Sequence, residues 1–312
     1  MNPPGSIIIA TRGSPLALWQ ARAVSARLQA VHPGLKVLVR EVRTEGDSSQ
    51  SVGTPLAAHE GRGVFTREVD QEVLLRRADI AVHSLKDQTT ELATGLRLGM
   101  VLERGHAEDA LVSHEKLELL DLPRGAQVGT GSPRRRAQLL RIRPDLRFLE
   151  VRGNIDTRLR RLDEGAVDAL VLARAGLERL GHSARITQSF SLETMLPAVA
   201  QAIVGVTCRD DDERVRALLL AADHPSTHAQ ALAERAMLRR LGGGCHAPIG
   251  ALARTHKGIL YLRGIVLSLD GKRAIEAMSK GPIPDAEETG RRLALELESR
   301  GAAALLREGG IV

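Results

Sequence analysis

The sequence predicts an α/β protein with two similar domains, each a mostly parallel sheet covered by helices, followed by a small α+β domain. Two observations support this. A strand–turn–helix motif occurs twice, at residues 7–15 and 127–136, and a similar order of strands and helices follows each copy. From about Pro225 the pattern changes to a long helix and a hairpin. Strands that alternate with helices are typical of parallel sheets, so the repeat indicates a duplicated domain.

Each copy of the motif ends in a serine followed by a proline. These are Ser14 and Pro15 in the first copy, and Ser132 and Pro133 in the second. Serine is a preferred helix N-cap, and proline fits the first helical position. Because a helix N-terminus has unpaired N–H groups and a partial positive charge, both copies predict a helix start that can bind an anion.

The repeat continues beyond the two helices. Strands predicted over 36–40 and 147–151 follow them, and strands over 78–82 and 167–171 correspond further along. A helix over 66–77 completes the first unit.

The polar run 42–63 between these elements is rich in turn-forming residues, which predicts a loop or lid. The chain is expected to cross to the second domain near 101–106 and to return near 196–201. Two crossings predict a cleft between the domains, a common place for a ligand.

The predicted domain boundaries follow from these crossings. Domain 1 comprises residues 1–103 and 202–222, domain 2 residues 104–201, and domain 3 residues 223–312. In domain 3, a helix over 226–241 stops at three glycines, and a hairpin turns at Asp270 and Gly271.

Composition narrows the class of protein. No apolar run reaches membrane-spanning length, and the first residues lack a basic segment before an apolar core, so we expect a cytoplasmic protein. Two cysteines, Cys208 and Cys245, provide no disulfide framework, and no residues have metal-site spacing. The net charge of +6 would suit a nucleic-acid partner, but aromatic residues at 2% are too few to stack bases. We therefore expect no nucleic-acid partner.

Arginine supplies most of the positive charge, and several arginines gather at predicted strand ends. Arg12 lies in the first motif and Arg134 and Arg135 in the second, while Arg152 and Arg158 flank the next turn. A planar guanidinium matches carboxylate or phosphate. This pattern favours a ligand with many acidic groups over a merely solvated surface.

Two further residues have chemistry of their own. Asp87 follows a buried strand at the end where open α/β sheets bind ligands, and it could stabilise a cation or exchange a proton with an amine. On local sequence alone, a turn or cap aspartate is the favoured interpretation. Cys245 follows three glycines and could be a nucleophile or an idle thiol, whereas Cys208 and His83 fit the core.

Five segments in order, spread over nearly the whole chain, resemble the porphobilinogen deaminase (hydroxymethylbilane synthase) family. They are Ala10–Ala17, Ala78–Asp87, Gly129–Arg135, Val151–Asn154 and Gly243–Gly250. The resemblance implies two periplasmic-binding-protein-like domains around a cleft plus a small α+β C-terminal domain. It also implies a cytoplasmic monomer of tetrapyrrole biosynthesis. The alternative is a non-catalytic carboxylate-binding relative or inactive paralogue.

The resemblance implies an activity and its residues. Four porphobilinogen molecules would condense head to tail with loss of ammonia on a dipyrromethane primer, releasing hydroxymethylbilane. Cys245 would carry the primer through a thioether, and Asp87 would be the catalytic acid. Because every pyrrole ring carries an acetate and a propionate, many basic residues are needed. The implied cofactor-binding residues are Lys86, Ser132, Arg134, Arg135, Arg152 and Arg158; the implied substrate-binding residues are Arg12, Ser14, Gln20, Arg152, Arg158, Arg179 and Gln201.

The sequence departs from the family pattern at three places that bear on the site. Gln88 and Thr89 stand where an apolar residue and a proline are usual after the catalytic aspartate. Thr207 stands in place of a glutamate, and Ala200-Gln201-Ala202 replaces Gly-Gln-Gly at the expected hinge.

Overall fold

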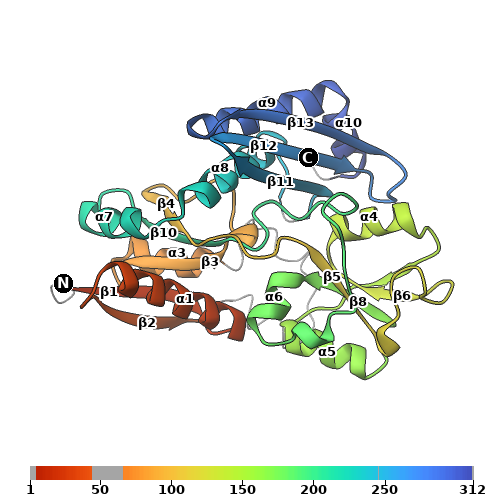
Figure 1. The fold of residues 1–312 in the computed structure, drawn as a ribbon, viewed down its shortest axis with the longest axis horizontal. Helices are drawn as coiled ribbons and strands as arrows, with labels where there is room; N and C mark the ends of the chain where they lie inside the picture. The colour runs from red at the N-terminus through yellow and green to blue at the C-terminus, as the bar shows by residue number, and fades with distance from the viewer. Residues whose placement is uncertain (1–4, 44–65, 245, 311–312) are drawn as a thin grey trace. The chain divides into compact units, whose positions relative to one another are not determined.

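A computed structural model of the chain describes residues 5–43, 66–244 and 246–310 (Figure 1). The chain divides into two compact units, Met1–Arg104 with Ile203–His228, and Gly105–Ala202 with Ala229–Val312. Their described parts contain three sheets. Nearly all of the predicted polar loop 42–63 lies outside the described residues.

The first unit is built on a five-stranded sheet in the order β2-β1-β3-β10-β4. β1 pairs in parallel with β2 and β3, and β10 is antiparallel to β3 and β4. Because successive strand residues point to opposite faces, Ile7 and Ile9 pack under α1 and α7, whereas Ala10 packs under α3. The elements are β1 (Ser6–Arg12), α1 (Pro15–Val31), β2 (Lys36–Val42), α3 (Arg67–Leu74), β3 (Ile80–Ser84), the 3₁₀ turn η2 (Leu85–Asp87), β4 (Leu96–Val101), β10 (Val204–Arg209) and α7 (Glu213–Ala222).

The second sheet, in the order β7-β6-β8-β5-β9, has the same topology. β6 pairs in parallel with β7 and β8, and β5 is antiparallel to β8 and β9. The fourth strand of each sheet, β10 or β5, begins shortly after a predicted crossing. The antiparallel direction of this strand was not predicted, but the duplicated α/β fold is confirmed. The elements are β5 (Asp109–Ser113), β6 (Gln127–Gly129), α4 (Pro133–Ile142), β7 (Arg147–Leu149), α5 (Ile155–Asp163), β8 (Ala169–Ala173), α6 (Arg174–Arg179) and β9 (Gln188–Ser189), with short 3₁₀ turns η3 (His114–Lys116) and η4 (Ser183–Arg185).

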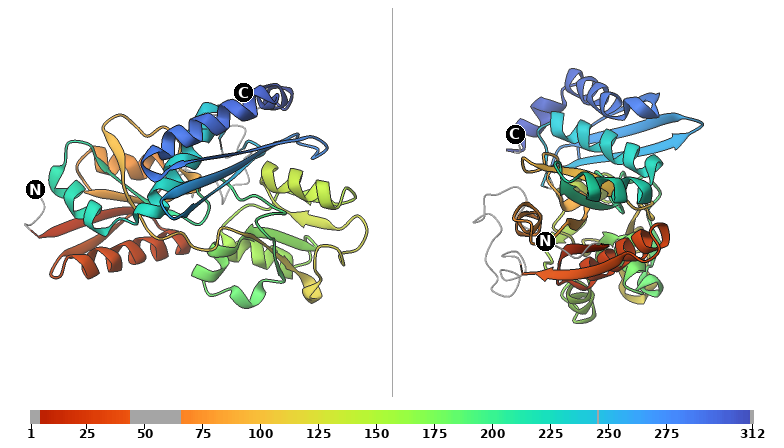
Figure 2. Two further views of the ribbon diagram at one scale, coloured as in Figure 1. Left: turned by 45° about the horizontal axis from the view of Figure 1, so that its top comes forward. Right: turned by 90° about the vertical axis from the view of Figure 1, so that its left-hand side faces the viewer.

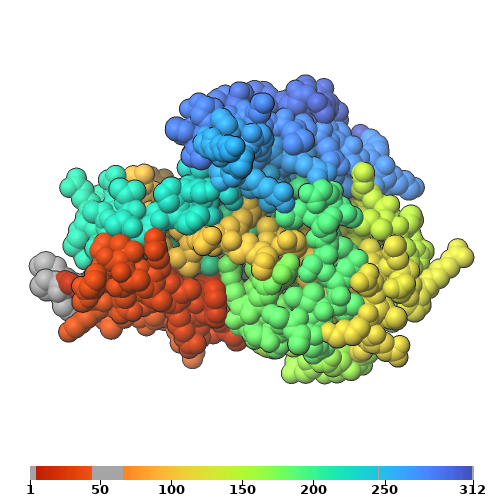
Figure 3. Space-filling view, in the orientation of Figure 1, coloured from red at the N-terminus to blue at the C-terminus, as the bar shows by residue number. Residues whose placement is uncertain are grey.

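The third sheet is an antiparallel meander, β11-β12-β13. Gly264 in β12 lets two helices approach closely, because a Cβ there would lie 2.7 Å from Met237 of α8 and 3.2 Å from Leu293 of α9. Figure 2 shows α9 along this sheet, and in Figure 3 the atoms of the C-terminal residues form one continuous blue region. The predicted hairpin is present, while β11 was not predicted. The elements are α8 (Pro225–Arg240), β11 (Ile249–His256), β12 (Ile259–Leu267), β13 (Ala274–Pro282), the 3₁₀ turn η5 (Ile283–Asp285), α9 (Ala286–Ser299) and α10 (Ala302–Glu308).

Both copies of the motif form the helix start that the sequence predicts. Ser14 Oγ accepts a hydrogen bond from the Ala17 N–H at 3.4 Å, and Ser132 Oγ accepts one from the Arg135 N–H at 3.5 Å. Each proline occupies the first turn of its helix. Within the described residues, no helix has the length and apolar character to span a membrane.

Candidate functional site

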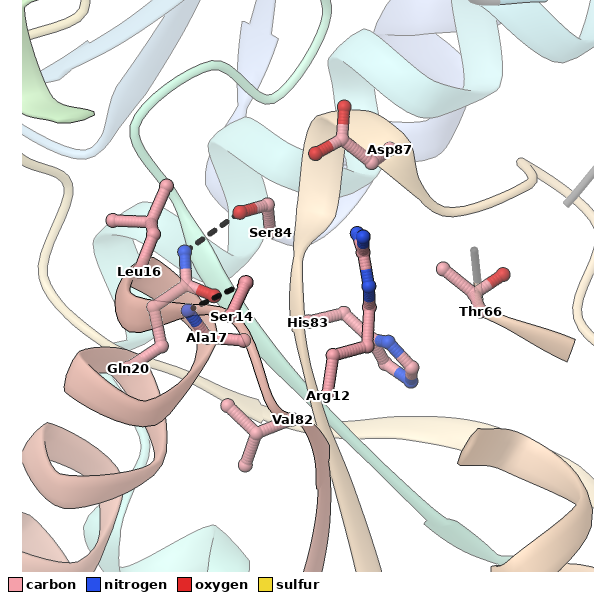
Figure 4. Close-up of a pocket in the computed structure, with 10 residues that line it drawn as sticks. All are labelled: Arg12, Ser14, Leu16, Ala17, Gln20, Thr66, Val82, His83, Ser84 and Asp87. Carbon is pink, nitrogen blue, oxygen red and sulfur yellow. Dashed lines mark hydrogen bonds between the residues drawn. The ribbon is translucent and has the colours of Figure 1, made fainter. Parts of the chain in front are cut away.

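A pocket lies where the first motif copy meets the end of β3 (Figure 4). Four predicted site residues line it, namely Arg12, Ser14, Gln20 and Asp87. The structure therefore brings together the basic side chain, the helix start and the carboxylate that the sequence predicts for the substrate side. The other lining residues are Leu16, Ala17, Thr66, Val82, His83 and Ser84.

Helix α1 is tied to the end of β3 through Gln20. This side chain is 2% exposed, and its Nε2 donates to Ser84 Oγ at 2.6 Å. Since Ser14 caps the same helix, the N-terminal turn of α1 is fixed against the strand end. Sequence reasoning did not single out Ser84 or Thr66 as pocket residues, although Ser84 lies within a recognised motif.

Asp87 is the last residue of η2, directly after β3. Leu85 is buried beneath the turn, and its N–H donates to the main-chain oxygen of Ile203 at 3.0 Å. Asp87 itself is exposed. In Figure 4 the Arg12 side chain extends past His83 toward Asp87. A carboxylate held at the rim of a pocket beside a guanidinium can stabilise a cation or transfer a proton.

A second group of predicted residues meets at Asp109, at the start of β5. Arg134 Nη2 lies 2.7 Å from Asp109 Oδ2, and the Arg135 Nε and Nη2 donate to Asp109 Oδ1 at 3.0 and 2.8 Å. The two arginines also donate to main-chain oxygens, of Leu196 at 2.6 Å and Val171 at 3.0 Å. All three charged side chains are buried, so two positive charges face one negative charge inside the protein.

Electrostatics keep this cluster ionised. Burial alone would raise the pKa of Asp109, but Arg134 and Arg135 outweigh it and hold that pKa well below the ordinary range. Burial lowers the pKa of Arg134, opposed by Asp109. Sequence reasoning missed Asp109. The available signal was an acidic residue opening the apolar strand Ala110–Val112.

Gln201 joins the same cluster. Its Nε2 donates to Asp109 Oδ1 at 3.0 Å and to the main-chain oxygen of Ala107 at 2.7 Å. Arg179 donates from Nη2 to the main-chain oxygen of Ala202 at 2.7 Å, and its burial lowers its pKa. Gln201 therefore lies in the same cluster as Arg134 and Arg135. The sequence had indicated a substrate-binding role for Gln201 and a cofactor-binding role for the two arginines.

Arg152 and Arg158 border the start of α5. Asn154 Oδ1 caps α5 by accepting from the Thr157 N–H at 2.8 Å. Arg158 Nε donates to the Gly153 main-chain oxygen at 2.8 Å, and Arg152 pairs with Glu150 at 3.0 Å. Both arginines remain partly exposed.

The predicted residues therefore fall into two groups, one in each unit. Lys86 lies in η2 beside Asp87 and is partly exposed, but it is outside the pocket lining. Cys245 lies outside the described residues. In the described ranges, no three His, Cys, Asp or Glu side chains are placed to hold a metal ion.

Solved structures with partial similarity to this chain include a domain of a Bordetella pertussis protein and two binding proteins. The Bordetella pertussis BvgS VFT2 domain is 16% identical, covering 70% of this chain and 87% of that chain with a TM-score of 0.42. The probable amino-acid ABC transporter extracellular-binding protein YtmK of Bacillus subtilis is 12% identical, covering 70% and 89% with a TM-score of 0.44. The periplasmic aliphatic sulphonate binding protein of Escherichia coli is 14% identical, covering 76% and 70% with a TM-score of 0.40.

Family models match nearly the whole chain. The model described as "Porphobilinogen deaminase, dipyromethane cofactor binding domain" matches residues 7–217, which include both motif copies and Asp87. The model described as "Porphobilinogen deaminase, C-terminal domain" matches residues 228–299. The first match alone covers more than half of the sequence, and the chain therefore belongs to the porphobilinogen deaminase family.

Proposed function

We propose that Asp87 is the catalytic residue of this enzyme. The reaction comes from the family: the chain is a hydroxymethylbilane synthase, a transferase that condenses four porphobilinogen molecules head to tail with loss of ammonia and releases hydroxymethylbilane. The family does not favour a non-catalytic carboxylate binder. One observation supports the choice of Asp87, which is its exposed carboxylate on the rim of the pocket that Arg12, Ser14 and Gln20 line.

The pocket suits a pyrrole that bears acidic groups and an aminomethyl group. Arg12 and the N-terminal turn of α1 offer positive charge to the carboxylates. An Asp87 carboxyl oxygen would give a proton to the departing amine, and the ionised carboxylate would then stabilise the cation that remains.

We also propose which residues hold the cofactor and the growing chain. Dipyrromethane, when bound, would supply the free pyrrole carbon to which the first ring is joined, and each later ring would join the ring before it. Its acidic side chains fit the described residues, because Arg152 and Arg158 are basic and partly exposed, and the buried cluster around Asp109 has one more positive than negative charge. The cofactor would be attached at Cys245 and held by Lys86, Ser132, Arg134, Arg135, Arg152 and Arg158. Arg12, Ser14, Gln20, Arg152, Arg158, Arg179 and Gln201 would face the substrate and the growing chain.

We further propose a cytoplasmic monomer with three domains, 1–103 with 202–222, 104–201 and 223–312. The presence of three separate sheets in the described residues supports three domains. Light scattering on the purified protein would give the mass of one chain. A dimer at micromolar concentration would overturn the monomer.

The role of Asp87 is tested by Asp87→Asn. The variant should fold and carry the cofactor if loaded, but its turnover should fall by roughly 10²–10⁴-fold, the usual contribution of a general acid. Glu91→Gln is the matched control, since Glu91 is an exposed carboxylate nearby that does not line the pocket. Hydroxymethylbilane formation would be measured, with thermal melting to confirm folding. Wild-type turnover by Asp87→Asn would remove Asp87 from the proposed role.

A further inference from the structure

The buried carboxylate of Asp70, on α3, accepts three hydrogen bonds near the pocket. Asp70 Oδ1 is 2.9 Å from His83 Nε2 and 2.9 Å from Thr207 Oγ1. Asp70 Oδ2 accepts from Gln88 Nε2 at 3.4 Å. The exposed fractions of these four residues range from 0 to 7%, so the cluster is inside the protein. Hydrogen bonds in the protein interior are electrostatically stronger than in water, so a buried network of this kind can restrain the segments that it joins.

Two of the three donors bracket the segment that carries Asp87. His83 lies near the end of β3, and Gln88 directly follows Asp87 at the end of η2. The third donor, Thr207, lies on β10 and pairs with Ala81, upstream of that segment. Asp70 therefore fixes both ends of residues 83–88 against α3, whereas its bond to Thr207 joins α3 to the neighbouring strand.

We propose that Asp70 is a positioning residue that holds the turn bearing Asp87 in its working geometry, which rests on the catalytic role proposed for Asp87. Gln88 and Thr207 are both departures from the family pattern, and both donate to this one carboxylate. The chain has Thr89 where a proline is usual, and so lacks the fixed φ that proline gives to a turn. The hydrogen bond from Gln88 Nε2 to Asp70 Oδ2 restrains this turn in place of a proline, because it ties the turn to α3.

The test compares two variants that each remove one donor from the same carboxylate. Gln88→Met keeps the length of the side chain and is expected to fold, because an apolar residue is usual at this position. Thr207→Val keeps the shape and is the matched control. If Asp70 positions Asp87, Gln88→Met lowers kcat by roughly tenfold with little change in KM, as expected for a small misplacement of a reacting group. Thr207→Val keeps the wild-type kcat, although both variants melt at lower temperature.

Asp70→Asn should lower kcat at least as much as Gln88→Met. Equal kcat in Gln88→Met and Thr207→Val, or a wild-type kcat in Gln88→Met, would overturn the proposal, because the cluster would then serve stability alone. Asp87→Asn, measured in parallel, separates the two ideas. A wild-type rate in Asp87→Asn sinks the catalytic role, whereas an inactive Asp87→Asn beside a fully active Gln88→Met sinks only the positioning role.

Discussion

Replacing Asp109 with asparagine should destabilise the protein strongly. The asparagine keeps one oxygen, which can still accept from Arg135 and Gln201 at the Oδ1 position. At the Oδ2 position it can place an NH₂ donor against Arg134 Nη2, 2.7 Å away in the native protein. Two buried guanidinium groups are then left without a neutralising carboxylate.

The size of the effect follows from burial. Asp109 is fully buried and the two arginines are 3% and 7% exposed, so water cannot compensate for the lost charge. Removing one partner from a buried ion pair typically costs about 3–5 kcal/mol. For a domain of 150–250 residues this corresponds to a fall in melting temperature of roughly 6–20 °C. Asp163→Asn is the control, because its pair with Arg185 at 2.6 Å is exposed and such pairs contribute about 0–1 kcal/mol.

Calorimetric melting of the wild type and both variants at pH 7 measures this difference. The pH dependence adds a second check. The pKa of Asp109 is lowered on folding, so its stabilising contribution is fully present above its unfolded pKa of about 3.9 and is lost as pH falls toward the folded pKa. The gap between wild type and Asp109→Asn should therefore narrow below about pH 4. If Asp109→Asn melts within 2 °C of Asp163→Asn, the two variants differ in free energy of unfolding by on the order of 1 kcal/mol or less. The buried ion pairs of Asp109 would then not stabilise the protein strongly.

Two other predictions concern single residues. Cys208 is buried, and burial raises the pKa of its thiol to about 11. A Cys245→Ala variant should therefore show no thiol that reacts with a disulfide reagent at pH 7 until the protein is unfolded. Rapid labelling of the folded variant would contradict this. Ala200 and Ala202 have φ of +58° and +68°, the left-handed region. In Ala202→Gly, relief of the steric strain should stabilise the fold by about 1 kcal/mol, and the larger backbone entropy lost on folding should destabilise it by a similar amount. The free energy of unfolding should therefore change less in Ala202→Gly than in Ala202→Val. Equal changes in urea unfolding would show that the turn is unstrained.

The duplicated fold could be predicted because its signals are local. Ser14 with Pro15, and Ser132 with Pro133, specify helix starts through side-chain and main-chain geometry within four residues. The antiparallel pairing of β5 and β10 escaped prediction because it is long-range. Strand β10 joins β3 across more than a hundred residues, and no periodicity encodes the direction in which two buried strands pair.

In the candidate site too, residues placed by local sequence could be predicted and those placed by long-range contacts could not. The motifs located Arg12, Ser14, Gln20 and Asp87, which one βα turn and one strand end bring together. Asp109 and Asp70 escaped because their importance lies in partners distant in sequence. Asp109 meets Gln201 from 92 positions away, and Asp70 meets Thr207 from 137 positions away. A buried acidic residue in a strand or helix looks ordinary until its donors are known.

The central claim is that this chain works on a covalent dipyrromethane carried by Cys245. The intact mass of the purified protein, made in cells that supply porphobilinogen, tests it most directly. We expect the wild type and the Asp163→Asn control to exceed the mass calculated from their sequences by two pyrrole units, and Cys245→Ala to show no excess. A wild-type protein at its sequence mass, or an excess that survives in Cys245→Ala, would contradict the claim.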